Sequence, residues 1–128
     1  MIALIRRWLK TSGPIENISA EAVSTFLQNL TGEGRFAVFE LPKRAPFAQV
    51  KGISSGGLHV EVSRRTPELE SLLRTLGDVT LTSSFGFPTA TTAAGGDDRA
   101  AQVIAQALVL LAADSHVANV VRVRTGSG

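Results

Sequence analysis

The chain has 128 residues, the length of one domain, and 13 basic against 11 acidic residues leave a formal charge of +2. It contains no cysteine, which excludes disulfides, thiolate metal sites and a cysteine nucleophile and is typical of a reducing compartment. We therefore expect a cytoplasmic protein. Because the charge excess is small and forms no concentrated basic patch, we expect no binding to nucleic acid.

The order of residues in the first segment, MIALIRRWLK, predicts neither a secretory signal nor a membrane span. Its apolar run precedes the arginines, and it is far shorter than the roughly 20 apolar residues that cross a bilayer. Ile2, Ile5, Trp8 and Leu9 fall on one helical face, so we expect an amphipathic helical segment within residues 1–13. Packing on the domain and docking to a membrane surface or partner are both open for it.

Residues 14–124 are expected to form a single domain that begins with a helix. Ser19 is its predicted N-cap, and Glu21 follows in the first turn, near the positive end of the helix dipole. Three strands come next, connected by short turns that favour an antiparallel meander. They are predicted for residues 36–41, 47–53 and 58–64.

The hairpin formed by the last two strands, FAQVKGISSGGLHVEVSRR, carries the clearest pattern. Its second strand alternates apolar and polar residues, so one face of the sheet is expected to contact solvent. Gly56 and Gly57 in the turn are expected to supply positive φ angles.

The second helix has the strongest local signals in the chain. Thr66 is its predicted N-cap, Pro67 takes the first helical position and Gly77 ends the helix. Residues 79–82 alternate and return to the sheet. Residues 83–96 hold either a fifth strand or an ordered loop, and the pattern does not separate the two.

A third helix is predicted to begin at a cap formed by Asp97 or Asp98 and to run to about Asp114. So much of it is apolar that it must be covered on more than one side. Two arrangements explain this pattern: a deeply embedded helix, or a helix that meets a second subunit.

The end of the chain alternates weakly. Val121 and Val123 alternate with Arg122 and Arg124. This pattern predicts a short edge strand whose basic residues discourage aggregation. Residues 125–128 resemble a linker and are expected to form a flexible tail.

The expected order is therefore α-β-β-β-α-β-(β)-α, an α+β domain in which helices pack against an antiparallel sheet. Its supply of catalytic groups is thin. His59 on a polar strand face and His116 beyond a helix end are expected to be solvated or capping residues. No spacing typical of a metal site, a nucleophile elbow or a phosphate loop occurs. We expect no enzyme activity, catalytic residue, cofactor or metal.

The element order, with FAVFELP, FAQVKG, GLHVEVSRR, LESLLRTLG and a closing alanine-rich helix, resembles the type III secretion chaperone-like fold and its YbjN-like relatives. The resemblance spans roughly Ser19 to His116. It implies a dimeric, non-enzymatic protein that holds an extended or partly unfolded segment of another protein against apolar grooves. The chain is mildly basic where those chaperones are usually acidic, and no tryptophan follows its Leu76-Gly77 pair. No secretion effector is therefore assigned as cargo.

Surplus apolar residues on a folded domain tend to mark an interface, unless a compact core absorbs them all. We expect a chaperone-like, homodimeric module that binds a protein or peptide segment. The residues expected to contact the partner are Phe36, Val38, Phe39, Phe47, Arg64 and Arg65.

Two other hypotheses stay open at this point. A small regulatory or toxin-neutralising protein would bind one folded partner as a monomer, through charges such as Arg64, Arg65 and His59. An enzyme of unfamiliar type would need His59 or His116 in a cleft with at least one carboxylate.

Overall fold

The structure, a computed structural model, describes residues 8–28, 30, 34–43 and 46–127. The helices are α2 (Ala20–Leu27), α3 (Pro67–Arg74) and α4 (Asp97–Ser115). The strands are β1 (Trp8–Thr11), β2 (Ile15–Glu16), β3 (Arg35–Glu40), β4 (Phe47–Gly52), β5 (Leu58–Val62), β6 (Thr80–Leu81), β7 (Pro88–Thr91) and β8 (Val120–Ser127).

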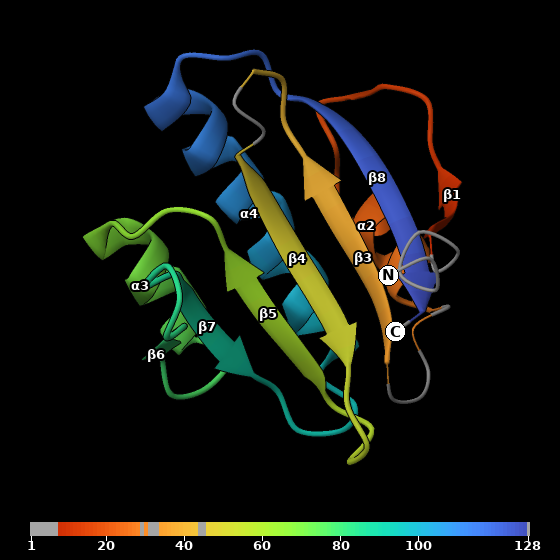
Figure 1. Ribbon diagram of the computed structural model, residues 1–128, viewed down its shortest axis with the longest axis vertical. Helices are drawn as coiled ribbons and strands as arrows, with labels where there is room; N and C mark the ends of the chain where they lie inside the picture. The colour runs from red at the N-terminus through yellow and green to blue at the C-terminus, as the bar shows by residue number, and fades with distance from the viewer. Residues whose placement is uncertain (1–7, 29, 31–33, 44–45, 128) are drawn as a thin grey trace.

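The strands pair in the order β1-β8-β3-β4-β5-β7-β6, and β2 pairs with the start of β8. Every pairing between them is antiparallel, and β3, β4 and β5 form the expected meander. Figure 1 shows α2 and α4 together on one side of this sheet. The predicted α+β class, with helices against an antiparallel sheet, is confirmed.

The two faces of the sheet differ because side chains alternate along each strand. On β4, Ala48 and Val50 are fully buried on the helix side, whereas Gln49 and Lys51 lie on the opposite face. The same alternation leaves His59 and Glu61 on β5 partly exposed, while Leu58, Val60 and Val62 are buried. The wet face predicted from the sequence is therefore present.

Helix α4 forms the middle of the helical layer. It contacts β4 and β5 beneath it, α2 on one flank and α3 on the other (Figure 1). Ile104, Leu108 and Leu111 are consequently fully buried within one chain. Of the two arrangements that explain the apolar sequence of α4, deep embedding accounts for these residues. Their apolar character is therefore no longer an argument for a second subunit.

The predicted caps of the first two helices are confirmed. The backbone N–H of Ala22 donates to Ser19 Oγ at 3.1 Å, and that of Leu69 donates to Thr66 Oγ1 at 3.2 Å. The predicted cap of the third helix is wrong. Gly96 occupies the N-cap of α4 without a side-chain hydrogen bond, and Asp97 falls inside the first turn, where its charge still faces the positive end of the dipole.

The helix expected near the N-terminus is wrong for Trp8–Thr11, which form β1 and pair with β8; residues 1–7 lie outside the described residues. The connection that follows is tied to the same strand. The backbone N–H of Ser12 donates to the carbonyl of Val123 at 2.8 Å, and the N–H of Val123 donates to Ser12 Oγ at 2.9 Å. Backbone groups along β8 need hydrogen-bond partners, and a short isolated helix is only marginally stable. Pairing with β8 is therefore favoured over the helix that the periodicity predicts.

The tail prediction is also wrong over residues 125–127, because they belong to β8 and pair with β3. Thr125 lies opposite Ala37, and Ser127 lies opposite Arg35. Since β1 pairs along its other side, β8 is an interior strand rather than the edge strand expected.

The two glycines of the β4–β5 turn differ in what they require. Gly56 has a φ of 88°, in agreement with the prediction. Gly57 does not have a positive φ. A Cβ there would collide with the backbone carbonyl oxygen of Thr92, so this glycine permits a close approach of two chain segments. Thr92 comes directly after β7. This strand, Pro88–Thr91, resolves the ambiguity over residues 83–96, which do contain a strand.

Candidate functional site

The expected contact residues on β3 do not share a surface. Phe39 is fully buried on the helix side, where its ring meets the ring of Phe26 edge to face with 5.9 Å between centroids. Its assignment to a partner surface is therefore wrong. Val38 and Phe36 lie on the opposite face, where Val38 is only 8% exposed and Phe36 is partly buried.

Of the remaining expected residues, Phe47 and Arg64 come together and Arg65 does not join them. Phe47 begins β4, and Arg64 follows the end of β5, so antiparallel pairing brings both to the same end of the sheet. Both line a cavity of about 460 Å³. Arg65 is turned elsewhere and forms an ion pair with Glu70 at the start of α3, at 3.6 Å.

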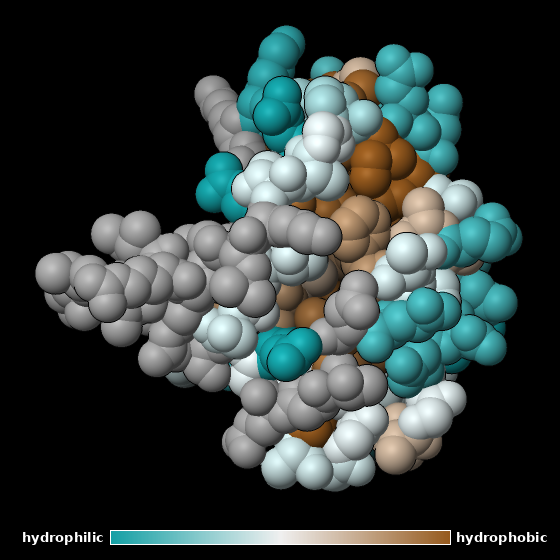
Figure 2. All heavy atoms as spheres, turned by 90° about the vertical axis from the view of Figure 1, so that its right-hand side faces the viewer, coloured by the Kyte–Doolittle hydropathy of each residue, from teal (hydrophilic) through white to brown (hydrophobic). Residues whose placement is uncertain are grey.

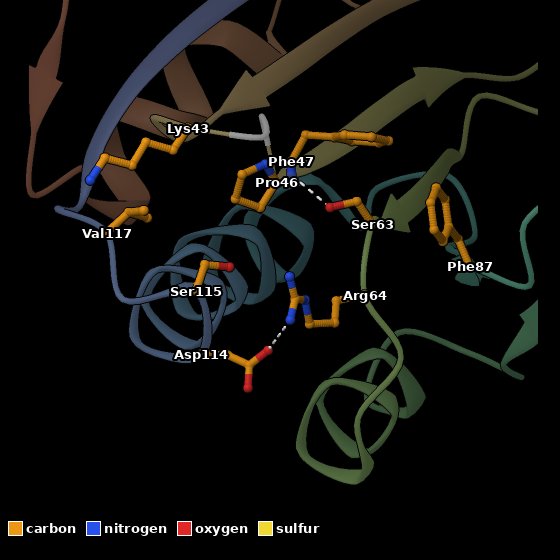
Figure 3. A pocket seen from close by; sticks show the side chains of 9 residues that line it. All are labelled: Lys43, Pro46, Phe47, Ser63, Arg64, Phe87, Asp114, Ser115 and Val117. Atoms are coloured by element: carbon orange, nitrogen blue, oxygen red, sulfur yellow. Dashed lines mark hydrogen bonds and ion pairs between the residues drawn. The ribbon is translucent and has the colours of Figure 1, made fainter.

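This cavity, here called the α4 cavity, lies between the C-terminal end of α4 and the end of the sheet (Figure 3). Its volume is in the range of pockets that accept a small ligand or one or two side chains. Both charged and apolar side chains line it. The lining residues are Lys43, Pro46, Phe47, Ser63, Arg64, Phe87, Asp114, Ser115 and Val117.

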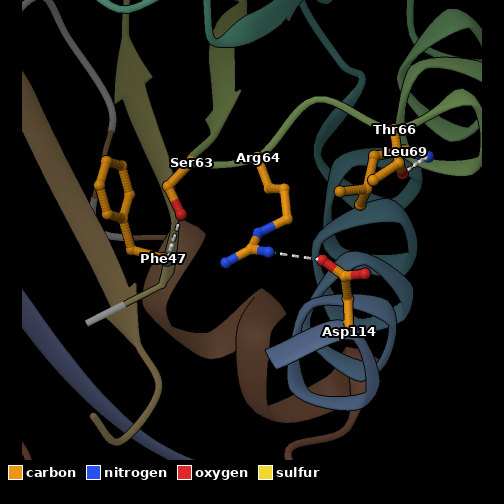
Figure 4. Close-up of polar contacts among 6 residues, drawn as sticks. All are labelled: Phe47, Ser63, Arg64, Thr66, Leu69 and Asp114. Atoms are coloured by element: carbon orange, nitrogen blue, oxygen red, sulfur yellow. Dashed lines mark hydrogen bonds and ion pairs between the residues drawn. The ribbon is translucent and has the colours of Figure 1, made fainter. Parts of the chain in front are cut away.

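Two contacts fix the walls of the α4 cavity (Figure 4). The backbone N–H of Phe47 donates to Ser63 Oγ at 2.8 Å, which closes the end of the β4–β5 ladder. Arg64 Nη1 lies 2.8 Å from Asp114 Oδ2, which ties the segment after β5 to the last turn of α4. Both partners of this ion pair are nearly half exposed, so we expect it to orient the guanidinium more than to stabilise the fold.

An aromatic trio, Phe47, Phe85 and Phe87, extends from the α4 cavity: Phe47 and Phe87 line it, and Phe85 stacks on Phe87 outside the lining. The rings of Phe47 and Phe87 meet edge to face with 6.0 Å between centroids. Phe85 stacks on Phe87 at 5.3 Å and is 77% exposed. An exposed ring that is already stacked offers a partner a large apolar contact whose conformation is largely set.

The β6–β7 hairpin holds this exposed ring in place. The backbone N–H of Thr82 donates to the carbonyl of Phe87, and the N–H of Phe87 donates to Thr82 Oγ1 at 3.0 Å. The N–H of Gly86 donates to the carbonyl of Thr82, and the φ of 68° at Gly86 suits a glycine in this turn. Phe85 thus projects from a hydrogen-bonded turn.

Two further polar groups belong to the α4 cavity. Ser115 Oγ is buried and, among the described residues, has no hydrogen-bond partner. Lys43 is exposed and stands in the turn between β3 and β4 with a φ of 53°. Figure 3 shows Ser115 and Arg64 facing the same space, while the side chain of Lys43 extends away from both, toward the side of Val117.

In the part of the chain described, His59 lies near the carboxyl group of Glu61 on the wet face, and the two histidines do not come together in the α4 cavity. His59 Nδ1 lies 2.9 Å from Thr91 Oγ1 on the wet face, and His116 ends α4 in the left-handed conformation with φ 55°. Neither lines the α4 cavity. Within residues 8–28, 30, 34–43 and 46–127, no group of three or more His, Asp or Glu side chains is arranged to hold a metal ion.

Sequence reasoning missed Phe85 and Phe87 because they lie in SSFGFPTATT, where periodicity fails. A signal was available. Two phenylalanines in a polar, glycine-containing loop contribute apolar surface where a loop usually has none, and loops often carry binding residues.

None of the helices among the described residues is long and apolar enough to cross a membrane. Comparison of the chain with protein-family models, with curated proteins and with solved structures finds no match.

Proposed function

We propose that this protein is a non-enzymatic, chaperone-like binding module that holds a segment of a partner polypeptide on the aromatic trio and in the α4 cavity. The observation that carries the proposal is the 77% exposed ring of Phe85, which stacks on Phe87, a residue that lines that cavity. Aromatic side chains of this kind dominate the energetics of many protein interfaces. No catalytic constellation among the described residues competes with this reading.

A short segment suits the site better than a broad folded surface. The cavity volume of about 460 Å³ is enough for one or two side chains of a peptide, while the stacked rings of the trio can contact its neighbouring residues. Leu81, which is 41% exposed on β6, extends the apolar contact along the same hairpin. The occupant we favour is therefore an extended segment that inserts a side chain into the cavity.

The homodimer expected from the sequence remains a prediction. Figure 2 shows hydrophobic surface bordered by hydrophilic residues on the side of the molecule that carries β1 and α2. A second copy would find apolar contacts there, away from the α4 cavity. The partner site as proposed does not require that copy.

The test is selection of peptides from a random library displayed on phage, followed by affinity measurement with fluorescein-labelled copies of the enriched peptides. Phe85→Ala is expected to weaken binding about tenfold or more, because it removes the exposed ring that stacks on Phe87. Val109→Ala is the matched control, since Val109 is a 53% exposed apolar residue on α4 that does not line the cavity.

Equal affinity of the Phe85→Ala and wild-type proteins would contradict the proposal. Failure to enrich any peptide, combined with tight binding of an intact folded protein, would favour the regulatory or toxin-neutralising alternative instead.

A further inference from the structure

We infer that the segment bound at this site is acidic: an Asp or Glu side chain next to an aromatic or aliphatic residue places its carboxylate in the α4 cavity, against Arg64 and Ser115, with Lys43 adding positive charge to the lining. This inference rests on the proposed function and specifies the chemistry of its partner. It follows from the kinds of polar groups that line the cavity and from their charge.

Most of the polar side chains that line the cavity are hydrogen-bond donors. Ser63 Oγ accepts the backbone N–H of Phe47 and keeps its O–H as a donor for a ligand. Ser115 Oγ is buried and has no partner among the described residues. Lys43 and Arg64 have only donors. A ligand that satisfies this set must supply acceptors.

The charge of the lining also favours an anion. Among the described residues that line it, Lys43 and Arg64 are cations and Asp114 is an acid, so positive charge is in excess there. Arg64 uses one end of its guanidinium for Asp114. Its other end points away from Asp114, into the space between Ser115 and Ser63 (Figure 3).

The end of α4 does not reverse this preference, although a helix C-terminus carries partial negative charge. Asp114 is neutralised by its ion pair with Arg64. The carbonyls of Ala112 and Ala113 accept the backbone N–H groups of Val117 at 3.0 Å and His116 at 3.3 Å. The Asp114 carboxylate and these two carbonyls are therefore already engaged.

The trio and the donors together define the ligand. Donors inside the cavity and rings beside it require a molecule with a carboxylate and an apolar group only a few residues apart, which a short stretch of polypeptide provides. Charge-assisted hydrogen bonds to a carboxylate are about twice as strong as neutral ones, so the acidic residue adds specificity to an apolar contact.

The experiment uses a library of peptides with one fixed phenylalanine and three randomised positions on either side. We expect enrichment of Asp or Glu within those positions. A fluorescein-labelled copy of the best peptide is then compared with the same peptide carrying Gln in place of Glu or Asn in place of Asp, and the wild-type protein is expected to bind the neutral copy about tenfold more weakly.

The protein variants are Lys43→Gln and Arg64→Gln, singly and together. The double variant is expected to lose the preference for the acidic peptide. Arg65→Gln is the matched control, because it removes the same charge from the adjacent residue, which pairs with Glu70 outside the cavity. A salt series with the wild-type protein gives a second readout that needs no mutation: affinity for the acidic peptide falls as NaCl rises, and affinity for the neutral copy changes little.

The outcomes separate this inference from the proposed function. Peptide binding that depends on Phe85 but shows no acidic preference, or a preference that survives the double variant, overturns the inference alone. Stronger binding of a phosphorylated peptide than of the acidic one also overturns it, because the cavity would then be a phosphate site. Binding that does not depend on Phe85 overturns the proposed function itself.

Discussion

Glu61 lies half-buried on the wet face of the sheet, between Gln49 on β4 and Thr89 on β7. Burial raises the pKa of its carboxyl group above the usual value, and the nearby His59 lowers it by a smaller amount. The folded protein therefore holds a proton on Glu61 more tightly than the unfolded chain does. The sign of the resulting pH effect follows from this difference.

Because the folded pKa is raised, the stabilising contribution of protonated Glu61 is complete below the unfolded value of about 4.5 and is lost as the pH rises through the folded pKa. We predict that Glu61→Gln, which stays neutral, raises the melting temperature relative to wild type more at about pH 7 than at about pH 4. Thermal unfolding followed by circular dichroism measures this, with exposed Glu16→Gln as the control. An equal difference at both pH values would contradict the assignment.

Single residues also mark the limit of local sequence reasoning. Ser19 and Thr66 were identified correctly because a cap depends on backbone N–H groups only a few residues away. Gly57 was explained by the wrong cause, since its requirement comes from the carbonyl of Thr92, which is far along the chain.

At the level of elements, β8 connects the two ends of the chain. It pairs with β1 and β2 from the N-terminal part and with β3 along the other side. Its last residues, which look like a linker, continue both ladders. The sequence pattern could not show this, because a strand with Thr-Gly-Ser has little hydrophobic signal and its pairing is decided by partners elsewhere in the chain.

We predict that ending the chain after Arg124 lowers the free energy of unfolding by about 2–4 kcal/mol, since several backbone hydrogen bonds of about 1 kcal/mol each are lost. The affected pairs include Ala37 with Thr125 and Trp8 with Gly126. Urea unfolding measures the change, and a chain ending after Ser127 is the control. If the two shortened chains were equally stable, residues 125–127 would not contribute to the sheet as described.

For the whole molecule, the α+β class and the meander were predictable because they depend on alternation, helix periodicity and short turns. The candidate site was predictable only in part. Phe47 and Arg64 are end residues of predicted strands and so were identified. The strand of Phe39 is apolar on both faces, which conceals the side that faces the core. The stacked pair of Phe85 and Phe87 depends on a hairpin that no periodic pattern marks.

The apolar residues that suggested an interface are thus divided between two places. Most lie in the core beneath α2, α3 and α4, where Val23, Leu73 and Leu108 are fully buried. A smaller group, led by Phe85, remains at the surface beside the α4 cavity. The proposed binding function depends on this second group.

The most direct measurement is NMR mapping of backbone amide shifts on titration with an enriched peptide. We predict that the largest shifts come from Ser63, Arg64, Phe85, Phe87 and Ser115, and that they report one saturating site. If the largest shifts came instead from Gln49, Lys51 and His59, in the middle of the wet face, the partner would bind elsewhere and this account would be contradicted.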